Sequence, residues 1–147
     1  MGFYKKKYKF VKKKNMKYRK KNRHKFILKC HLIFVYKYRK PLINEGVRKV
    51  MLFLFRKIEE TSSFRIEIME TDRNHMHMVI DYPPTLSITS IVRRLKQIST
   101  KELWKLFGEE LRKEFWKERT FWNDGYFVCS IGEANPETIR KYIENQG

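Results

Sequence analysis

The chain has 147 residues, a length typical of one domain with a buried core. Its hydrophobic content of 41%, with 15% aromatic residues, argues against a disordered chain, and apolar runs such as Met51 to Phe55 are far too short to span a bilayer. No apolar segment follows the N-terminal lysines, so we expect no secretion signal and a cytoplasmic protein. Cys30 and Cys129 lack the paired spacing of a zinc finger, and we expect two buried thiols, with one disulfide as the open alternative.

The net charge of +18 is concentrated near the N-terminus. Residues 1–40 hold 17 Lys and Arg and no Asp or Glu, whereas the remaining chain holds 17 basic and 16 acidic residues, a net charge of only +1. Such a basic block binds polyanions by counterion release and indicates a nucleic-acid partner, the alternative being a solvated tail that aids solubility or targeting. We expect residues 1–24 to form a basic, flexible arm and residues 25–147 to form one folded domain.

Hydrophobic periodicity and capping signals place seven regular elements after the arm. Asn44 and Ser87 are good caps for two amphipathic helices. Residues 71–74 are typical of a hairpin connection, so the strands on either side of it should pair antiparallel. The seven expected elements are a strand at 26–36, a helix at 45–60, strands at 64–70 and 74–81, a helix at 88–107, a strand at 126–132 and a helix at 136–146. Between the last two helices, residues 109–117 form a further helical or an irregular stretch.

The strand at 74–81 carries the first chemically distinctive pattern. Alternation along a strand directs His75 and His77 to one face and Met76 and Met78 to the other. Two imidazoles on one face are close enough to share a metal ion through neutral ring nitrogens. The alternative is a pair of half-exposed strand histidines without a ligand.

The final helix carries a second pattern. Tyr142 and Gln146 are four residues apart and share one helical face, while Ile139 and Ile143 form the face that packs. An amide oxygen can complete a set of two histidines and one oxygen around a divalent ion, and a set without thiolate favours Mg²⁺ or Mn²⁺ over structural zinc. For either residue alone, ordinary packing is the alternative.

Several segments resemble those of the IS200/IS605-type transposases, both in their residues and in their order along the chain. The resemblance extends from about Asn22 to the C-terminus. The segments that carry it are Asn22-Arg23-His24, His31 to Val35, Lys37 to Pro41, His75 to Val79, Pro83-Pro84, Phe121-Trp122, Gly125 to Val128 and Arg140 to Gln146.

This resemblance implies a single-tyrosine enzyme of the HUH superfamily, with Tyr142 as the nucleophile and with His75, His77 and Gln146 as ligands of Mg²⁺ or Mn²⁺. It implies an α/β (α+β) sandwich, ferredoxin-like or RRM-like, with an antiparallel sheet and helices on one face. It also implies a homodimer, in which the tyrosine of one subunit can act beside the histidines of the other. The implied substrate is single-stranded DNA with hairpin ends, cut and rejoined through a 5′-phosphotyrosine.

Charge and position alone suggest which side chains contact DNA, and we expect Lys37, Arg39, Lys40, Arg93 and Arg94. Two other functions remain open: a related enzyme that nicks palindromes or has been domesticated, and a non-catalytic RRM-like nucleic-acid-binding protein. The second rests on Gly125 to Val128, which partly resembles an RNA-recognition motif. It leaves Tyr142 and both histidines without a role.

Overall fold

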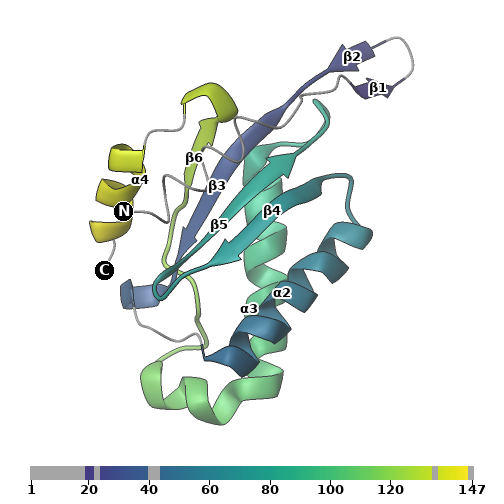
Figure 1. Cartoon of the computed structure of the whole chain (residues 1–147). Helices are drawn as coiled ribbons and strands as arrows, with labels where there is room; N and C mark the ends of the chain where they lie inside the picture. Colours follow the sequence, from purple (N-terminus) through teal and green to yellow (C-terminus); the bar gives the residue numbers. More distant parts are fainter. Residues whose placement is uncertain (1–18, 22–23, 40–43, 134–135, 146–147) are drawn as a thin grey trace.

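The structure, a computed structural model, describes residues 19–21, 24–39, 44–133 and 136–145. A four-stranded antiparallel sheet in the order β4-β5-β3-β6 forms its centre (Figure 1). The elements are β1 (Arg19–Lys21), β2 (His24–Phe26), β3 (Lys29–Val35), η1 (Lys37–Arg39), α2 (Glu45–Glu60), β4 (Arg65–Thr71), β5 (His75–Asp81), α3 (Ile88–Glu114), β6 (Phe127–Ser130), η2 (Ile131–Glu133) and α4 (Pro136–Glu144). The predicted α+β class and antiparallel sheet are confirmed.

The register of the two central strands determines the two faces of the sheet. Ile33 on β3 pairs with His77 on β5 and, on its other side, with Phe127 on β6. Directly paired residues share a face, so the odd-numbered residues of β3 and β5 line one face and the even-numbered residues line the other. A β-bulge at Glu67 interrupts the pairing of the outer strand β4, and the Glu67 carboxylate lies 2.7 Å from Lys29 Nζ.

The two long helices, α2 and α3, cover the even-numbered face and enclose the main core (Figure 1). The α2 helix has the predicted bounds, and the Asn44 side chain accepts a hydrogen bond of 2.8 Å from Val47 N. Phe34 of β3 makes edge-to-face contacts with Phe55 and with Trp122, whose ring centroids lie 6.5 and 5.4 Å away. Trp122 donates to Ser99 Oγ at 2.9 Å, which satisfies its indole N–H inside the core.

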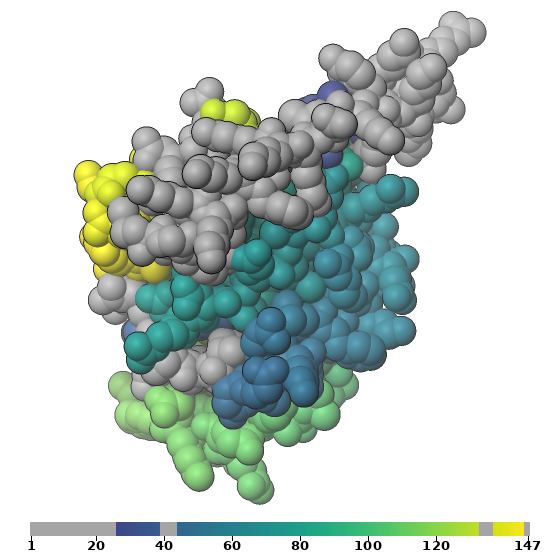
Figure 2. Space-filling model, in the orientation of Figure 1, coloured from purple at the N-terminus to yellow at the C-terminus, as the bar shows by residue number. Residues whose placement is uncertain are grey.

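The short helix α4 packs on the opposite face. Ile139 and Ile143, the two residues predicted to pack, are buried against Ile33 and Val35 of β3. In the space-filling view α4 (yellow) and α2 (blue) are well separated on the surface (Figure 2). The sheet therefore has a thick core on one side and a small helical cover on the other.

Several boundaries differ from the sequence prediction. The strand predicted at 126–132 is shorter, because β6 ends at Ser130 and η2 follows it. The α3 helix continues to Glu114, through Phe107, whose φ of −124° and ψ of 28° are not helical. Of the two alternatives for residues 109–117, the helical one is therefore correct as far as Glu114. The first predicted strand divides into β2 and β3, because residues 27 and 28 leave the extended ladder. Finally, β1 and β2 pair antiparallel on the two sides of the expected boundary at residue 24, so the division into arm and domain stays a prediction. Residues 1–18 lie outside the described part of the chain.

Both cysteines are free thiols, which removes the disulfide alternative. Cys30 is buried, and this burial raises the pKa of its thiol to about 12, whereas Cys129 is only partly covered. Within the described residues, no helix combines the length and the apolar character that crossing a membrane requires.

Two phenylalanines on α2 provide a test of the core. Phe55→Ala is expected to lower the free energy of unfolding by about 3–5 kcal/mol, because Phe55 is fully buried and its removal leaves a cavity. Phe53→Ala is the matched control, since Phe53 is 59% exposed and should change stability by no more than about 0.5–1 kcal/mol. Urea denaturation measures both. Equal losses of stability for the two variants would contradict this description of the core.

Candidate active site

His75 and His77 lie on the face of β5 away from the long helices, as the alternation predicted. Both side chains are only 1% exposed, so the alternative of half-exposed strand histidines is wrong. On this second face α4 packs against Ile33 and Val35, and Ile131 packs against Val79 and Ile68, a packing that a strand pattern alone does not show. Burial on both faces makes β5 the most enclosed strand of the described sheet.

A third histidine, His31 on β3, belongs to the same group, and sequence reasoning missed its role. Its Nδ1 lies 2.8 Å from Nε2 of His77, and the two rings stack with centroids 5.1 Å apart. Burial lowers the pKa of His31 to about 4, so the imidazole is neutral near pH 7 and can accept a hydrogen bond from its neighbour. The signal available in the sequence was a histidine at an odd position, directly before the apolar end of a strand.

Hydrogen bonds define which ring nitrogens could face a metal. His75 Nδ1 lies 2.9 Å from Asn74 Oδ1, and because an amide oxygen only accepts, this nitrogen carries the proton. The lone pair of His75 is then on Nε2. When His77 Nε2 donates to His31, its lone pair is on Nδ1. Such partners fix the tautomers of metal-binding histidines, so the pair fits nitrogen ligation.

A third ligand for such an ion was predicted from the final helix. Among the described residues, no three His, Cys, Asp or Glu side chains gather as a metal site. The predicted third ligand, Gln146, supplies an amide oxygen, and it lies outside the described residues. Its role therefore stays a prediction.

Tyr142 projects from α4 onto the face that carries the histidines. Its ring packs at 5.5 Å from the ring of Phe127, and burial raises the pKa of its half-buried phenol. The hydroxyl oxygen lies 4.0 Å from the position that a Cβ atom would take at Gly125. Gly125 has φ +81°, the left-handed conformation in which a side chain is strained. The phenol thus rests against a turn that only glycine adopts without cost.

The tyrosine and the histidines share a face but are separated across it. Phe127, the contact of Tyr142, is two strands away from His77, since Ile33 pairs with both. With neighbouring strands 4.7–4.9 Å apart, this separation is about 10 Å at the backbone. The Tyr142 hydroxyl faces the Gly125 turn, on the β6 side.

The predicted DNA-binding residues fall into different surroundings. Lys37 lies 3.9 Å from the carboxylate of Asp124, and Arg93 is exposed on α3. Arg94 instead bonds to Thr61 and Ser62, and this ties α3 to the turn after α2, which gives Arg94 a structural role as well. The side chain of Arg39 and the whole of Lys40 are outside the described part of the structure.

Lys96 was not predicted as a site residue, but it connects α3 to the Gly125 turn. Its ammonium group donates to the carbonyl oxygens of Asn123, at 2.8 Å, and of Gly125. Burial lowers the pKa of this amine to about 8, with a partly opposing contribution from Asp124. A lysine in a helical charge pattern gives no sign that it will bond to a distant turn.

Comparison with known proteins identifies similar chains. Residues 24–146 match the profile of the family described as "Transposase IS200 like". The transposase for insertion sequence element IS200 of Salmonella typhimurium is 33% identical over 118 residues, which are 80% of this chain and 76% of that protein. The crystal structure of a candidate transposase from Deinococcus radiodurans R1 has a TM-score of 0.79 and 26% identity, and covers 87% of this chain and 97% of that one. A REP-associated tyrosine transposase bound to a REP hairpin shares the fold, with a TM-score of 0.51 and 13% identity, over 86% of this chain and 68% of that one.

The Gly125 turn can be tested by adding a methyl group. Gly125→Ala is expected to lower the free energy of unfolding by about 1–2 kcal/mol, because alanine is strained at positive φ. Gly132→Ala is the control, since no atom lies within 4 Å of its new Cβ and its φ is not positive. Chemical denaturation compares the two, and an unaffected Gly125→Ala protein would rule out the strained turn.

Proposed function

The chain belongs to the family of IS200-like transposases, enzymes of DNA transposition, and we propose that it cuts and rejoins single-stranded DNA through Tyr142. The observation that carries this proposal is the placement of a half-buried tyrosine and two buried histidines on one face of the sheet. The family match also makes a non-catalytic RRM-like binding protein the weaker interpretation, since that interpretation leaves all three side chains unused.

The proposed reaction is a transesterification. The phenol oxygen of Tyr142 attacks the scissile phosphorus, the bond from phosphorus to the 3′ oxygen breaks, and the departing oxygen takes up a proton to become a 3′-hydroxyl. The product is a 5′-phosphotyrosine, and attack by another 3′-hydroxyl reverses the step and joins DNA. Because burial raises the pKa of the phenol, Tyr142 is protonated near pH 7 and must lose its proton during attack.

The histidines suit a bound Mg²⁺ or Mn²⁺, which would polarise the phosphate. His75 Nε2 and His77 Nδ1 are the nitrogens left for it by the hydrogen bonds to Asn74 and His31, and the amide oxygen of Gln146 is the proposed third ligand. His31 would act as a positioning residue, because it holds the tautomer and the ring plane of His77.

We place the complete site between two copies of the chain. In one chain Tyr142 faces the Gly125 turn, about two strand spacings from His77, and a second copy could supply the missing half of each site. The proposed DNA carries hairpin ends, and exposed cations such as Arg93, together with the basic N-terminal residues, are its expected contacts. The same fold is seen with a hairpin in the REP-associated transposase.

Tyr142→Phe is expected to abolish a denaturant-resistant adduct between the protein and labelled single-stranded DNA with hairpin-flanked ends. Tyr126→Phe is the matched control and should keep the adduct, because Tyr126 lies on the other side of the Gly125 turn with its hydroxyl 3.5 Å from Thr89. A chelator should remove the adduct as fully as Tyr142→Phe does. Denaturing electrophoresis measures the amount of adduct in each case. An adduct that persists in Tyr142→Phe would overturn the proposal.

A mixture of Tyr142→Phe and His77→Ala chains tests the shared site. If Tyr142 works beside the histidines of a second copy, mixed dimers hold one intact site, and the mixture should recover about a quarter of the wild-type adduct. Each variant alone should give none. No recovery after confirmed subunit exchange would place both halves of the site in one chain.

His31→Leu is expected to weaken Mn²⁺ binding about 10–100-fold, the usual cost of removing a partner behind a metal-bound histidine. His31→Asn should recover part of the affinity, because its amide oxygen can take the place of Nδ1. Titration calorimetry measures the affinity and denaturation checks that each variant is folded. Equal affinities for the Leu variant and the wild type would mean that His31 only packs.

A further inference from the structure

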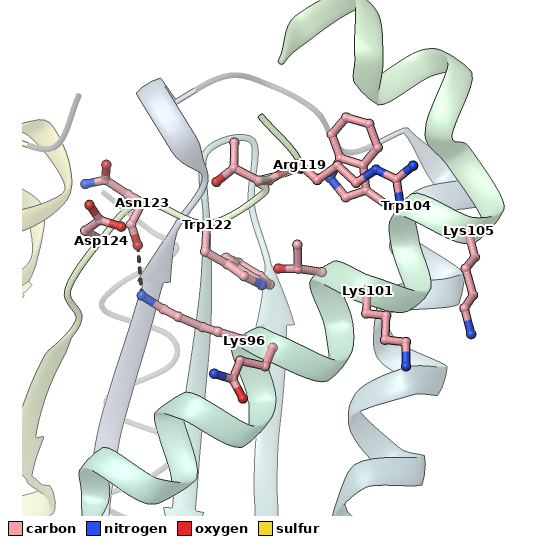
Figure 3. A pocket seen from close by; sticks show the side chains of 11 residues that line it. Lys96, Lys101, Trp104, Lys105, Arg119, Trp122, Asn123 and Asp124 are labelled. Carbon is pink, nitrogen blue, oxygen red and sulfur yellow. Dashed lines mark hydrogen bonds between the residues drawn. The ribbon is translucent and has the colours of Figure 1, made fainter. Parts of the chain in front are cut away.

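A basic pocket lies outside the proposed active site, between α3 and the segment 119–124 (Figure 3). It has a volume of about 540 Å³, within the range of small-ligand sites. Figure 3 shows Lys101 and Lys105 extending from α3, with Arg119 beside Trp104 and with Lys96 reaching across to Asn123. Nothing in the proposed phosphotyrosine chemistry uses this pocket.

The floor of the pocket is aromatic and rigid. Trp104 and Trp122 line it while being only 7% and 4% exposed. Trp104 donates its indole N–H to the Thr120 carbonyl at 2.8 Å, and Trp122 donates to Ser99, so neither ring is free to turn. A flat apolar group entering the pocket meets surfaces already in place, which lowers the entropic cost of binding.

The rim is positively charged. Lys96, Lys101, Lys105 and Arg119 line the pocket with a single acid, Asp124. Asp124 also lies 3.9 Å from Lys37, which offsets part of its charge, and the Arg119 guanidinium lies 5.9 Å from the centre of the Trp104 ring. Cations around an aromatic floor match a group that is flat at one end and anionic at the other.

We propose that this pocket binds one unpaired nucleotide of single-stranded DNA, a proposal that rests on the function proposed above. The base lies against the edges of Trp104 and Trp122, and a neighbouring phosphate lies among Lys101, Lys105 and Arg119. Aromatic contact with bases and cationic contact with phosphates are the two interactions by which proteins hold unpaired strands.

The pocket is joined to the proposed nucleophile through one turn. Lys96 lines the pocket and bonds to the carbonyl oxygens of Asn123 and Gly125, and the Tyr142 hydroxyl approaches the same Gly125. Because α3 and α4 cover opposite faces of the sheet, the bound nucleotide and Tyr142 lie on the two sides of this turn. A strand that occupies both would pass around β6.

Tryptophan fluorescence tests the pocket directly. The chain has three tryptophans, and in Trp116→Phe the two that remain both line the pocket. Titration of this variant with the single-stranded oligonucleotide (dT)₆ is expected to quench its fluorescence to saturation, whereas inorganic phosphate should not. An unchanged spectrum, while a gel shift shows (dT)₆ bound, would overturn the proposal.

Charge variants locate the phosphate. In the same background, Lys101→Gln with Lys105→Gln should weaken the quenching interaction about tenfold and lower its salt dependence by roughly 0.7 for each phosphate that the protein no longer neutralises. Lys57→Gln is the matched control, since Lys57 lies 3.6 Å from Glu60 on α2 much as Lys105 lies 3.4 Å from Glu102. Equal weakening in the control and the double variant would contradict a phosphate site here.

The adduct assay separates this proposal from the one on which it rests. Adduct formation that depends on Tyr142, without quenching of Trp104 and Trp122, would remove the pocket proposal alone. Quenching that responds to Lys101 and Lys105, without any adduct, would leave the pocket in place and remove the phosphotyrosine.

Discussion

The register between β3 and β5 is the constraint on which the site depends. Pairing Ile33 with His77 puts Leu32, Phe34, Met76 and Met78 into the core, and it puts His31 beside His77 on the other face. A slip of β5 by one residue would reverse its side chains, moving Met76 and Met78 out of the core and turning His75 and His77 toward the long helices. The apolar contacts of the even-numbered residues therefore fix the positions of the histidines on the odd-numbered face.

Burial gives the histidine group its properties. Polar rings taken out of water need partners, and the contacts from His31 to His77 and from Asn74 to His75 supply them. The same burial keeps His31 neutral near pH 7, so it can accept a hydrogen bond without adding a charge beside a proposed cation site. On the opposite side of the sheet, Lys96 is a partly buried amine, and the backbone carbonyls of the turn supply its hydrogen-bond partners.

Local signals were sufficient for much of this structure. The α2 helix begins and ends where the Asn44 cap and its periodicity predict, and the odd and even residues of β5 face as their alternation requires. The contacts that were missed all join distant segments: His31 with His77, and Lys96 with the Gly125 turn. Their partners depend on which strands pair and on where a helix crosses a loop, and neither is encoded in the spacing of nearby residues. The extension of α3 through Phe107 was predicted only as one of two alternatives, because its last turns are polar and add little periodic signal.

The bulge at Glu67 affects how the sheet meets other chains. An outer strand offers unpaired backbone groups, and a flat one can recruit a strand from another molecule and start an aggregate. In β4 the extra residue distorts this outer ladder, and the bond from Lys29 to Glu67 places opposite charges beside it. A misfolded or second chain would have to strip an ion pair and straighten the bulge before it could extend the sheet there. The same irregularity that shifts the register of β4 thus protects the folded chain against growth into a continuous β-structure.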